Sequence, residues 1–337
     1  MSDLLPLLIL GLALSLLWLI AFTMRSLARP PRRTVAWAIA RSRPSDPSEL
    51  PTPRPFETIS IKHNAIDSAP AWIIQGDNPA GPVLIFCHGW GESKLDILQR
   101  LDAVAPLCSK IISWDLPGHG EAPKGPSPLG TSEWMILEDL IELAQGEDLD
   151  ARERATEQLE ATLEDQADWE ALFDAPPKPG APKVVLWGYS LGAGIAIDLA
   201  ANRSRRVSAI IAESPYRLPH TPARNMLALK RLPWRINLPP AMFLLGLSRS
   251  RGPRWTGFDR AHLAKDLRCP ILVIRGDMDE ISPPEDAHDI AHAAPDATLI
   301  TLTGATHFDL WTDPKQADAR ERAIRAIADF IRSIPTS

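Results

Sequence analysis

Cysteine is scarce in this sequence, and the motifs that would assign a cofactor are missing. The 337 residues include only three cysteines, Cys87, Cys108 and Cys269. Three cysteines cannot all pair, and each stands in or beside an apolar, strand-like run, so we expect buried reduced thiols. They form no zinc-binding pair, and the sequence has neither a dinucleotide fingerprint nor a phosphate-binding loop. We therefore expect no metal and no nucleotide cofactor.

An excess of positive charge and internal repeats are also missing. The chain has 36 Lys and Arg against 42 Asp and Glu, which gives a formal net charge of −6. This balance argues against a dedicated nucleic-acid binder. The composition, 45% hydrophobic and 23% charged, is ordinary for a globular protein. The length is sufficient for one large α/β domain with appendages.

A long apolar run is present at the N-terminus. Leu4–Met24 is 21 residues without a charge, close to the roughly 20 that cross a bilayer as a helix. A cleaved signal peptide usually has a basic start and a shorter apolar core, but here Asp3 precedes the run and four arginines follow it between Arg25 and Arg33. We expect residues 1–28 to be an uncleaved transmembrane anchor, with a signal peptide or a buried core helix as the alternatives. The arginines predict a single-pass protein whose bulk is cytoplasmic.

The segment after this run differs from the rest of the chain. Residues 29–55 are rich in Pro, Arg and Ser, which predicts a juxtamembrane linker whose arginines contact anionic lipid headgroups. From Phe56 onward, short apolar runs alternate with helix-like segments. We therefore expect a folded domain over residues 56–337.

The apolar runs of this domain predict a parallel sheet. Runs of Val, Ile and Leu without polar alternation indicate strands buried on both faces, and strands that alternate with helices indicate βαβ units. The expected strands are Thr58–Lys62, Ala71–Gln75, Val83–Cys87, Lys110–Trp114, Lys183–Trp187, Val207–Ala212, Ile271–Arg275 and Thr298–Thr303. The expected helices are Lys94–Ala105, Thr131–Ala144, Leu191–Asn202, Pro284–Ala293 and Pro314–Ser333. The sequence therefore predicts an α/β fold.

Two stretches interrupt the alternation. Residues 147–174 hold eleven Asp or Glu and two Arg, a charge of 2 − 11 = −9. We interpret them as a solvated amphipathic insertion, with a docking surface for a basic partner as the alternative. Residues 215–260 hold nine Lys or Arg, one acidic residue and the apolar stretch Leu238–Leu245. A long connection after the sixth strand lies over the carboxyl ends of the strands, where open α/β sheets bind ligands, so we expect a lid there.

A candidate nucleophile stands at one strand-to-helix junction. The sequence Gly188-Tyr189-Ser190-Leu191-Gly192 follows an apolar strand and leads directly into a helix. A sharp turn presents a serine hydroxyl in the open, and glycines two positions to either side relieve the crowding between strand and helix. The Leu191 N–H, at the start of the helix, is suited to donate to a developing oxyanion.

Three further loops complete this constellation. His88-Gly89-Trp90-Gly91 follows the third strand, and its Trp90 N–H is a candidate second oxyanion donor. Gly276–Pro283 follows the seventh strand and carries carboxylates, among them Asp279. His307 stands in the loop after the eighth strand. Nucleophile, acid and base therefore come in the order Ser, Asp, His, each at the same edge of the sheet.

This arrangement resembles the α/β-hydrolase superfamily over nearly everything from Phe56 to the C-terminus, and within it the serine aminopeptidase-like and monoacylglycerol-lipase-like branch. The resemblance implies a mostly parallel eight-stranded sheet with helices on both faces. It implies a triad in which Ser190 is the nucleophile, Asp279 orients and charge-balances the base, and His307 is the general base and then the acid. The implied oxyanion donors are the backbone N–H groups of Trp90 and Leu191. The loop Asp115–Gly120 also matches, although Glu121 and Ala122 stand where a serine usually follows.

Other residues are alternatives for these roles. Asp277 and Glu213 are alternative acids at the ends of the seventh and sixth strands, and we interpret His88 as fixing its loop rather than as a base. His288 and His292 stand four apart on an expected helix, a spacing that suits two metal ligands, but no third ligand is evident. The remaining candidate histidines, His63, His220 and His262, are interpreted as surface or loop residues.

These features together predict a membrane-anchored serine hydrolase that cleaves a carboxylic ester through an acyl-enzyme intermediate. The N-terminal run and the apolar lid suggest a small-molecule or lipid-like acyl substrate, and the basic residues of the lid suggest an anionic substrate or headgroup. The same triad also serves peptidases, thioesterases and acyltransferases. A membrane-tethered binding protein without catalysis is the alternative from another class. The sequence assigns no protein partner.

Overall fold

One eight-stranded sheet forms the centre of the domain in the computed structural model, which describes residues 4–63, 67–146, 179–202 and 206–335. The strands are β1 (Phe56–His63), β2 (Asp67–Gln75), β3 (Val83–Cys87), β4 (Lys110–Trp114), β5 (Val184–Tyr189), β6 (Val207–Glu213), β7 (Ile271–Gly276) and β8 (Ala297–Leu302). Their order is β1-β2-β4-β3-β5-β6-β7-β8. Only β2 runs antiparallel to its neighbours. The mostly parallel eight-stranded sheet predicted from the sequence is confirmed.

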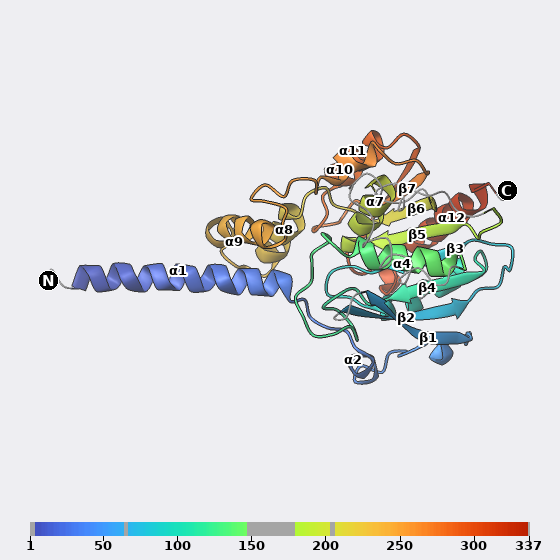
Figure 1. Cartoon of the computed structure of the whole chain (residues 1–337), viewed down its shortest axis with the longest axis horizontal. Coiled ribbons are helices and arrows are strands. Elements are labelled where there is room, and N and C mark those ends of the chain that lie inside the picture. The colour runs from blue at the N-terminus through green and yellow to red at the C-terminus, as the bar shows by residue number, and fades with distance from the viewer. Residues whose placement is uncertain (1–3, 64–66, 147–178, 203–205, 336–337) are drawn as a thin grey trace, which may run out of the picture.

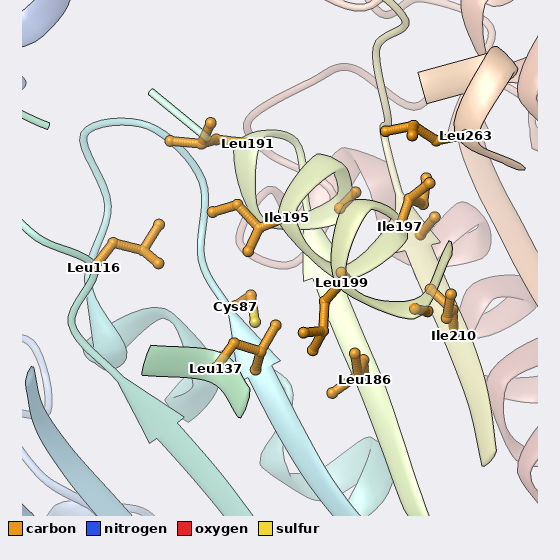
Figure 2. Packing of buried hydrophobic residues seen from close by; sticks show 14 of the residues in the cluster. Cys87, Leu116, Leu137, Leu186, Leu191, Ile195, Ile197, Leu199, Ile210 and Leu263 are labelled. Atoms are coloured by element: carbon orange, nitrogen blue, oxygen red, sulfur yellow. The ribbon is translucent and has the colours of Figure 1, made fainter. Parts of the chain in front are cut away.

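Helices cover both faces of the sheet. Side chains alternate between faces along each strand, so Ile85 packs into one apolar cluster while Leu84 and Phe86 pack into the other. The first cluster includes residues of α4 (Trp134–Ala144), α7 (Leu191–Asn202), α10 (Arg260–Ala264) and α11 (Pro284–Ala293). The second includes residues of η2 (Lys94–Gln99), α3 (Leu101–Val104) and α12 (Ala317–Ser333), which follows the short η3 (Pro314–Gln316). Figure 2 shows Ile195 and Leu199 of α7 packed beside Cys87 and Leu186 of the sheet.

The helix expected over Lys94–Ala105 is divided in two. The 3₁₀ helix η2 ends before Arg100, and α3 follows it. A continuous α-helix would bond the Arg100 N–H to the carbonyl of Asp96. Instead the Arg100 guanidinium bonds to that carbonyl at 2.9 Å, and the Arg100 N–H bonds to Ile97 at 2.8 Å. The side chain of Arg100 therefore replaces one bond of the helical ladder.

The N-terminal helix α1 (Leu4–Ala28) projects from the domain (Figure 1). It is the one helix, among the described residues, that is long and apolar enough to cross a membrane. A membrane anchor and a signal sequence share this length and composition.

Residues 29–55, the expected juxtamembrane linker, contain short helices and contact the domain. They include α2 (Val35–Ile39) and η1 (Pro47–Glu49). Arg32 donates to the carbonyl of Gly120 at 2.8 Å, and Arg33 pairs with Asp96 at 2.8 Å. Further along, Arg54 is buried and pairs with Asp77 at 2.7 Å. A Pro- and Arg-rich composition is therefore also compatible with a segment that packs on the domain, where Arg32, Arg33 and Arg54 find acceptors. Arg29, Arg41 and Arg43 are exposed.

The two insertions differ in what can be described. The acidic insertion 147–174 lies outside the described residues. Residues 215–260, called the cap segment below, contain α8 (His220–Leu229) and α9 (Trp234–Ser248) and end at the first residue of α10. Figure 1 shows α8 and α9 beside the end of α1 that is nearer the sheet.

Candidate active site

Ser190 lies at a sharp turn between β5 and α7. Its φ is +51°, in the left-handed region that non-glycine residues rarely adopt. A Cβ on Gly192 would lie 1.9 Å from the carbonyl oxygen of Cys87, and one on Gly188 would lie 2.4 Å from the Cα of Ala193. Neither position can accept a side chain without moving the backbone. The glycine spacing is therefore what lets the strand turn into the helix with the serine at its tip.

Three of the predicted site residues meet in one hydrogen-bonded chain. The Nε2 of His307 lies 3.1 Å from the Oγ of Ser190. Its Nδ1 lies 2.8 Å from Oδ2 of Asp279. All three residues are buried, each about 6% exposed. One imidazole thus contacts a hydroxyl on one side and a carboxylate on the other, which is the arrangement that removes a proton from a serine.

Asp279 is held in place by its own loop. Its Oδ1 accepts the backbone N–H of Ile281 at 2.9 Å and that of Ser282 at 2.8 Å. These two backbone donors fix the orientation of the carboxylate. The alternative acid Asp277 is exposed and accepts the N–H of Gly304 at 2.7 Å, so it ties together the loops after β7 and β8.

The other alternative acid, Glu213, belongs to a different network. Its carboxylate accepts two bonds from Arg100, at 3.0 and 3.2 Å. It also accepts the indole N–H groups of Trp187 at 3.0 Å and Trp311 at 2.6 Å. Both Arg100 and Glu213 are nearly inaccessible to solvent. At the end of β6 the structure therefore has a buried ion pair whose carboxylate already accepts four hydrogen bonds, rather than a free acid.

The turn after β3 is fixed by His88. The Nδ1 of His88 lies 2.8 Å from the carbonyl of Gly89, and its Nε2 accepts the N–H of Leu116 at 3.0 Å. Burial lowers the pKa of His88 to about 3, so the ring is neutral, as its acceptor role requires. This geometry fits the loop-fixing interpretation. The turn carries Trp90, whose indole N–H donates to the carbonyl of Leu27 in α1 at 2.9 Å.

A mostly apolar cavity lies over Ser190 and His307. The two candidate oxyanion donors, Trp90 and Leu191, are among its lining residues, and so is Leu27 of α1. Leu191 is the first residue of α7, where a backbone N–H has no partner inside its helix. The cap segment supplies Tyr216, Pro219, Pro222, Ala223, Met226, Met242 and Trp255. The space beside the serine is therefore suited to an apolar group.

Two contributors to this site carry no signal in the sequence. Tyr189, the variable residue of the glycine-serine motif, donates its hydroxyl to the carbonyl of His307 at 2.6 Å. Leu27 reaches the cavity from α1, a helix that the sequence assigns only to the membrane. In both cases the contact joins segments far apart in the chain.

None of the remaining candidates lines the cavity over Ser190. His288 and His292 are on α11 with their rings 6.1 Å apart. Across the described residues, no group of three or more His, Cys, Asp or Glu is arranged to hold a metal ion. His220 and His262 are exposed, and His63 ends β1. All three cysteines are free, and burial raises the pKa of each thiol to about 12.

Comparisons with known proteins agree with this architecture. The chain is similar to an esterase from Pyrococcus furiosus, with a TM-score of 0.59 and 15% identity over 91% of this chain and 98% of that one. It is similar to a monoacylglycerol lipase from Paleococcus ferrophilus, with a TM-score of 0.51 and 20% identity over 83% of this chain and all of that one. A 105-residue stretch is 31% identical to protein bem46 of Schizosaccharomyces pombe, covering 30% of this chain and only 29% of that protein.

The model of the alpha/beta hydrolase family matches residues 84–319, which include β3 through β8 and the loops that carry the serine, the aspartate and the histidine. One conclusion follows from this match, from the sheet order and from the position of the cavity at the carboxyl ends of the parallel strands. The chain belongs to the alpha/beta hydrolase family, and it has the fold of that family.

Proposed function

We propose that this protein is a serine hydrolase that cleaves a carboxylic ester through an acyl-enzyme intermediate. The observation that carries the proposal is the hydrogen-bonded chain from Ser190 through His307 to Asp279, with distances of 3.1 and 2.8 Å. The esterase and the lipase with a similar fold support it as analogies.

In the proposed first half-reaction, the neutral imidazole of His307 accepts the hydroxyl proton as Ser190 Oγ attacks the ester carbonyl. The carbonyl oxygen becomes an oxyanion, which the N–H groups of Trp90 and Leu191 stabilise. The imidazolium, balanced by the carboxylate of Asp279, then gives its proton to the alkoxide that leaves. The products of this step are the acyl-enzyme and a free alcohol.

The second half-reaction uses the same groups. A water molecule loses a proton to His307 as it attacks the acyl carbonyl, and the second tetrahedral intermediate collapses to release the carboxylic acid and restore the Ser190 hydroxyl. The apolar lining of the cavity supports an acyl chain, rather than a charged group, beside the serine.

Activity-based labelling tests the nucleophile. We expect the full-length protein to react with a fluorophosphonate probe and to hydrolyse p-nitrophenyl esters, and Ser190→Ala to do neither. A Ser190→Ala protein that keeps its probe labelling would overturn the assignment. Matched amide and thioester substrates test the peptidase and thioesterase alternatives, because a higher kcat/KM on either would replace the ester in the proposal. An added alcohol or amine that captures the acyl group faster than water would indicate an acyltransferase.

We also propose that α1 is an uncleaved anchor and that the domain is cytoplasmic. Arg25 and Arg29 are exposed directly after the apolar run, where the positive-inside rule counts charges. Mass spectrometry of the membrane-extracted protein should give the full length, and protease added outside intact cells should leave the domain whole. A mass that lacks the first ~25 residues would indicate a signal peptide instead.

A further inference from the structure

We infer that α9 of the cap segment is inserted in the same membrane leaflet as the end of α1, and that the cavity over Ser190 takes its acyl substrate directly from that leaflet. The substrate class is an amphiphilic ester with a long acyl chain that resides in the bilayer. The second half of this inference rests on the proposed ester hydrolysis. The first half, the membrane contact of α9, does not.

The length of α1 requires part of the domain to meet the bilayer. Its side chains are exposed without interruption from Leu5 to Trp18, and from Leu19 onward the helix is partly covered by the rest of the protein. The free part has 18 − 5 + 1 = 14 residues, which at 1.5 Å each span about 21 Å. A hydrocarbon core is about 30 Å thick. The remaining ~9 Å corresponds to about six residues and ends near Met24, immediately before the first charge at Arg25.

The first turn of α9 lies at this depth. The amide of Asn237 donates to the hydroxyl of Thr23 at 2.5 Å, and both residues are 1% exposed. The hydroxyl of Thr23 in turn bonds to the carbonyl of Leu19 at 2.9 Å. Figure 1 shows α9 beside this part of α1, whereas the sheet lies beyond the end of the helix. A bilayer that covers α1 as far as Met24 therefore also reaches α9.

The outer face of α9 is apolar enough for lipid. Its exposed large side chains are Ile236 at 61%, Phe243 at 48%, Leu244 at 42% and Leu247 at 49%. Spacings of 7, 8 and 11 residues put all four on one face of a helix. The opposite face is buried and also apolar, with Leu238, Met242 and Leu245. From Leu238 to Leu247 the helix is apolar all round. Such a helix belongs in a core or in a membrane, and no described residue covers the outer face.

Basic and aromatic residues mark the membrane surface next to this face. Four exposed basic residues lie on α8, in the turn after it and at the start of α9: Arg224, Lys230, Arg231 and Arg235. Arg235 stacks on Trp234 with 4.7 Å to the ring centre. Lys230 lies 5.9 Å from the ring of Trp90, and that indole bonds to the carbonyl of Leu27. Trp, Lys and Arg at the level where α1 leaves the hydrocarbon are suited to anionic lipid headgroups.

The cavity is built from the same two helices. Leu27 of α1 and Met242 on the inner face of α9 line it together with Ser190. An acyl chain that enters the cavity from the leaflet would therefore lie against mostly apolar side chains, while its headgroup stays with the basic residues. A substrate dissolved in water gains nothing from this arrangement, which is why we assign a bilayer-resident ester.

The membrane contact is tested by lipid quenching. Full-length protein is reconstituted in nanodiscs of phosphatidylcholine and phosphatidylglycerol, with an environment-sensitive fluorophore on Ile236→Cys, Phe243→Cys or the control Ile39→Cys. Ile39 is 62% exposed and lies on α2, beyond the end of α1. We expect nitroxides on the lipid acyl chains to quench the first two labels and not the third. Quenching of all three labels by aqueous iodide would overturn the inference. So would labels on α9 that are quenched only when the nitroxide is attached to a second copy of the protein and not to lipid.

The route of the substrate is tested with a charge on α9. Ile236→Glu should lower the rate on a long-chain ester in phosphatidylglycerol-containing vesicles about tenfold, equivalent to about 1.4 kcal/mol, and leave the rate on soluble p-nitrophenyl acetate within about twofold of the parent protein. Ile39→Glu should change neither rate. Equal effects of Ile236→Glu on both substrates, or none, would overturn the route. Failure of the proposed function would look different, because the soluble ester would then not be hydrolysed in a Ser190-dependent way.

Discussion

The hydroxyl of Tyr189 donates a 2.6 Å hydrogen bond to the backbone carbonyl of His307. The two residues are 118 positions apart, and the bond joins the turn that carries Ser190 to the loop that carries the imidazole. Burial raises the pKa of Tyr189 well above its usual value, so the phenol remains a donor over the whole physiological range. Tyr189 is thus a positioning residue for the proposed base, since it acts on the loop and not on the substrate.

Tyr189→Phe should therefore impair catalysis more than substrate binding. The variant keeps the ring but leaves the His307 carbonyl without its donor, and small misplacements of a catalytic group are costly. We expect kcat to fall about tenfold, which is consistent with the cost of ~1–3 kcal/mol for leaving a buried polar group without its hydrogen bond. Steady-state kinetics on a soluble ester should show this with KM changed less than about twofold. An unchanged kcat would show that the bond does not position the base.

Asp279 and Asp277 form a matched pair for testing the acid. Asp279→Asn keeps the shape but favours the wrong tautomer of His307, so we expect kcat to fall by about 10³–10⁴. Asp277→Asn removes a charge two residues away, on a carboxylate that is exposed and accepts the Gly304 N–H. We expect that control to keep more than about half the parent rate. The reverse order of effects would transfer the role to Asp277.

Glu213 should matter for stability. Its carboxylate and Arg100 are 2% and 4% exposed, so removing one partner leaves a buried charge without its ion-pair partner. We expect Glu213→Gln to lower the free energy of unfolding by about 3–5 kcal/mol, measured by denaturant titration in detergent. Arg100→Met in the same background should recover part of that loss, because it removes the unpaired guanidinium. A variant with full stability and no activity would instead restore Glu213 as a candidate acid.

The sheet and the loops of the site are predictable from the sequence because their signals are local. An apolar run without alternation defines each strand within a few residues, and the glycines around Ser190 report a steric requirement that the structure confirms at 1.9 and 2.4 Å. The network of Arg100 and Glu213 is not predictable in this way, because its partners are 113 residues apart. The same holds for the packing of Arg32 on Gly120, where composition indicated a linker and a distant carbonyl provides the partner.

Gly192→Ala tests the turn itself. The new Cβ would lie 1.9 Å from the backbone oxygen of Cys87, so the strand and the helix must separate. We expect a loss of more than about 2 kcal/mol in the free energy of unfolding, in the range of overpacked cores. Gly125→Ala is the control, because a Cβ there meets nothing within 4 Å, and surface changes of this kind stay within about 0.5 kcal/mol. Equal stability of the two variants would contradict the steric account of the motif.

Two buried histidines should make the fold sensitive to acid. His88 and His119 stack edge to face with their ring centres 5.1 Å apart, and both are 0% exposed. Burial lowers the pKa of each to about 3, with the neighbouring histidine as a further cause for His119. The neutral form of His88 is also required by its bond from the Leu116 N–H.

An unfolded histidine binds a proton below about pH 6.5. In the folded protein these two histidines bind one only near pH 3. Between these two pH values the unfolded state therefore holds more protons than the folded state. The free energy of unfolding should then decrease as the pH falls below about 6.5, by up to about 1.4 kcal/mol per pH unit for each histidine. His119→Phe keeps an aromatic ring against His88 but has no site for a proton. Its free energy of unfolding should therefore fall less steeply than that of the parent protein between pH 6 and pH 4, as measured by denaturant titration at each pH. Parallel pH profiles for the two proteins would show that His119 takes up its proton in the folded state as readily as in the unfolded one.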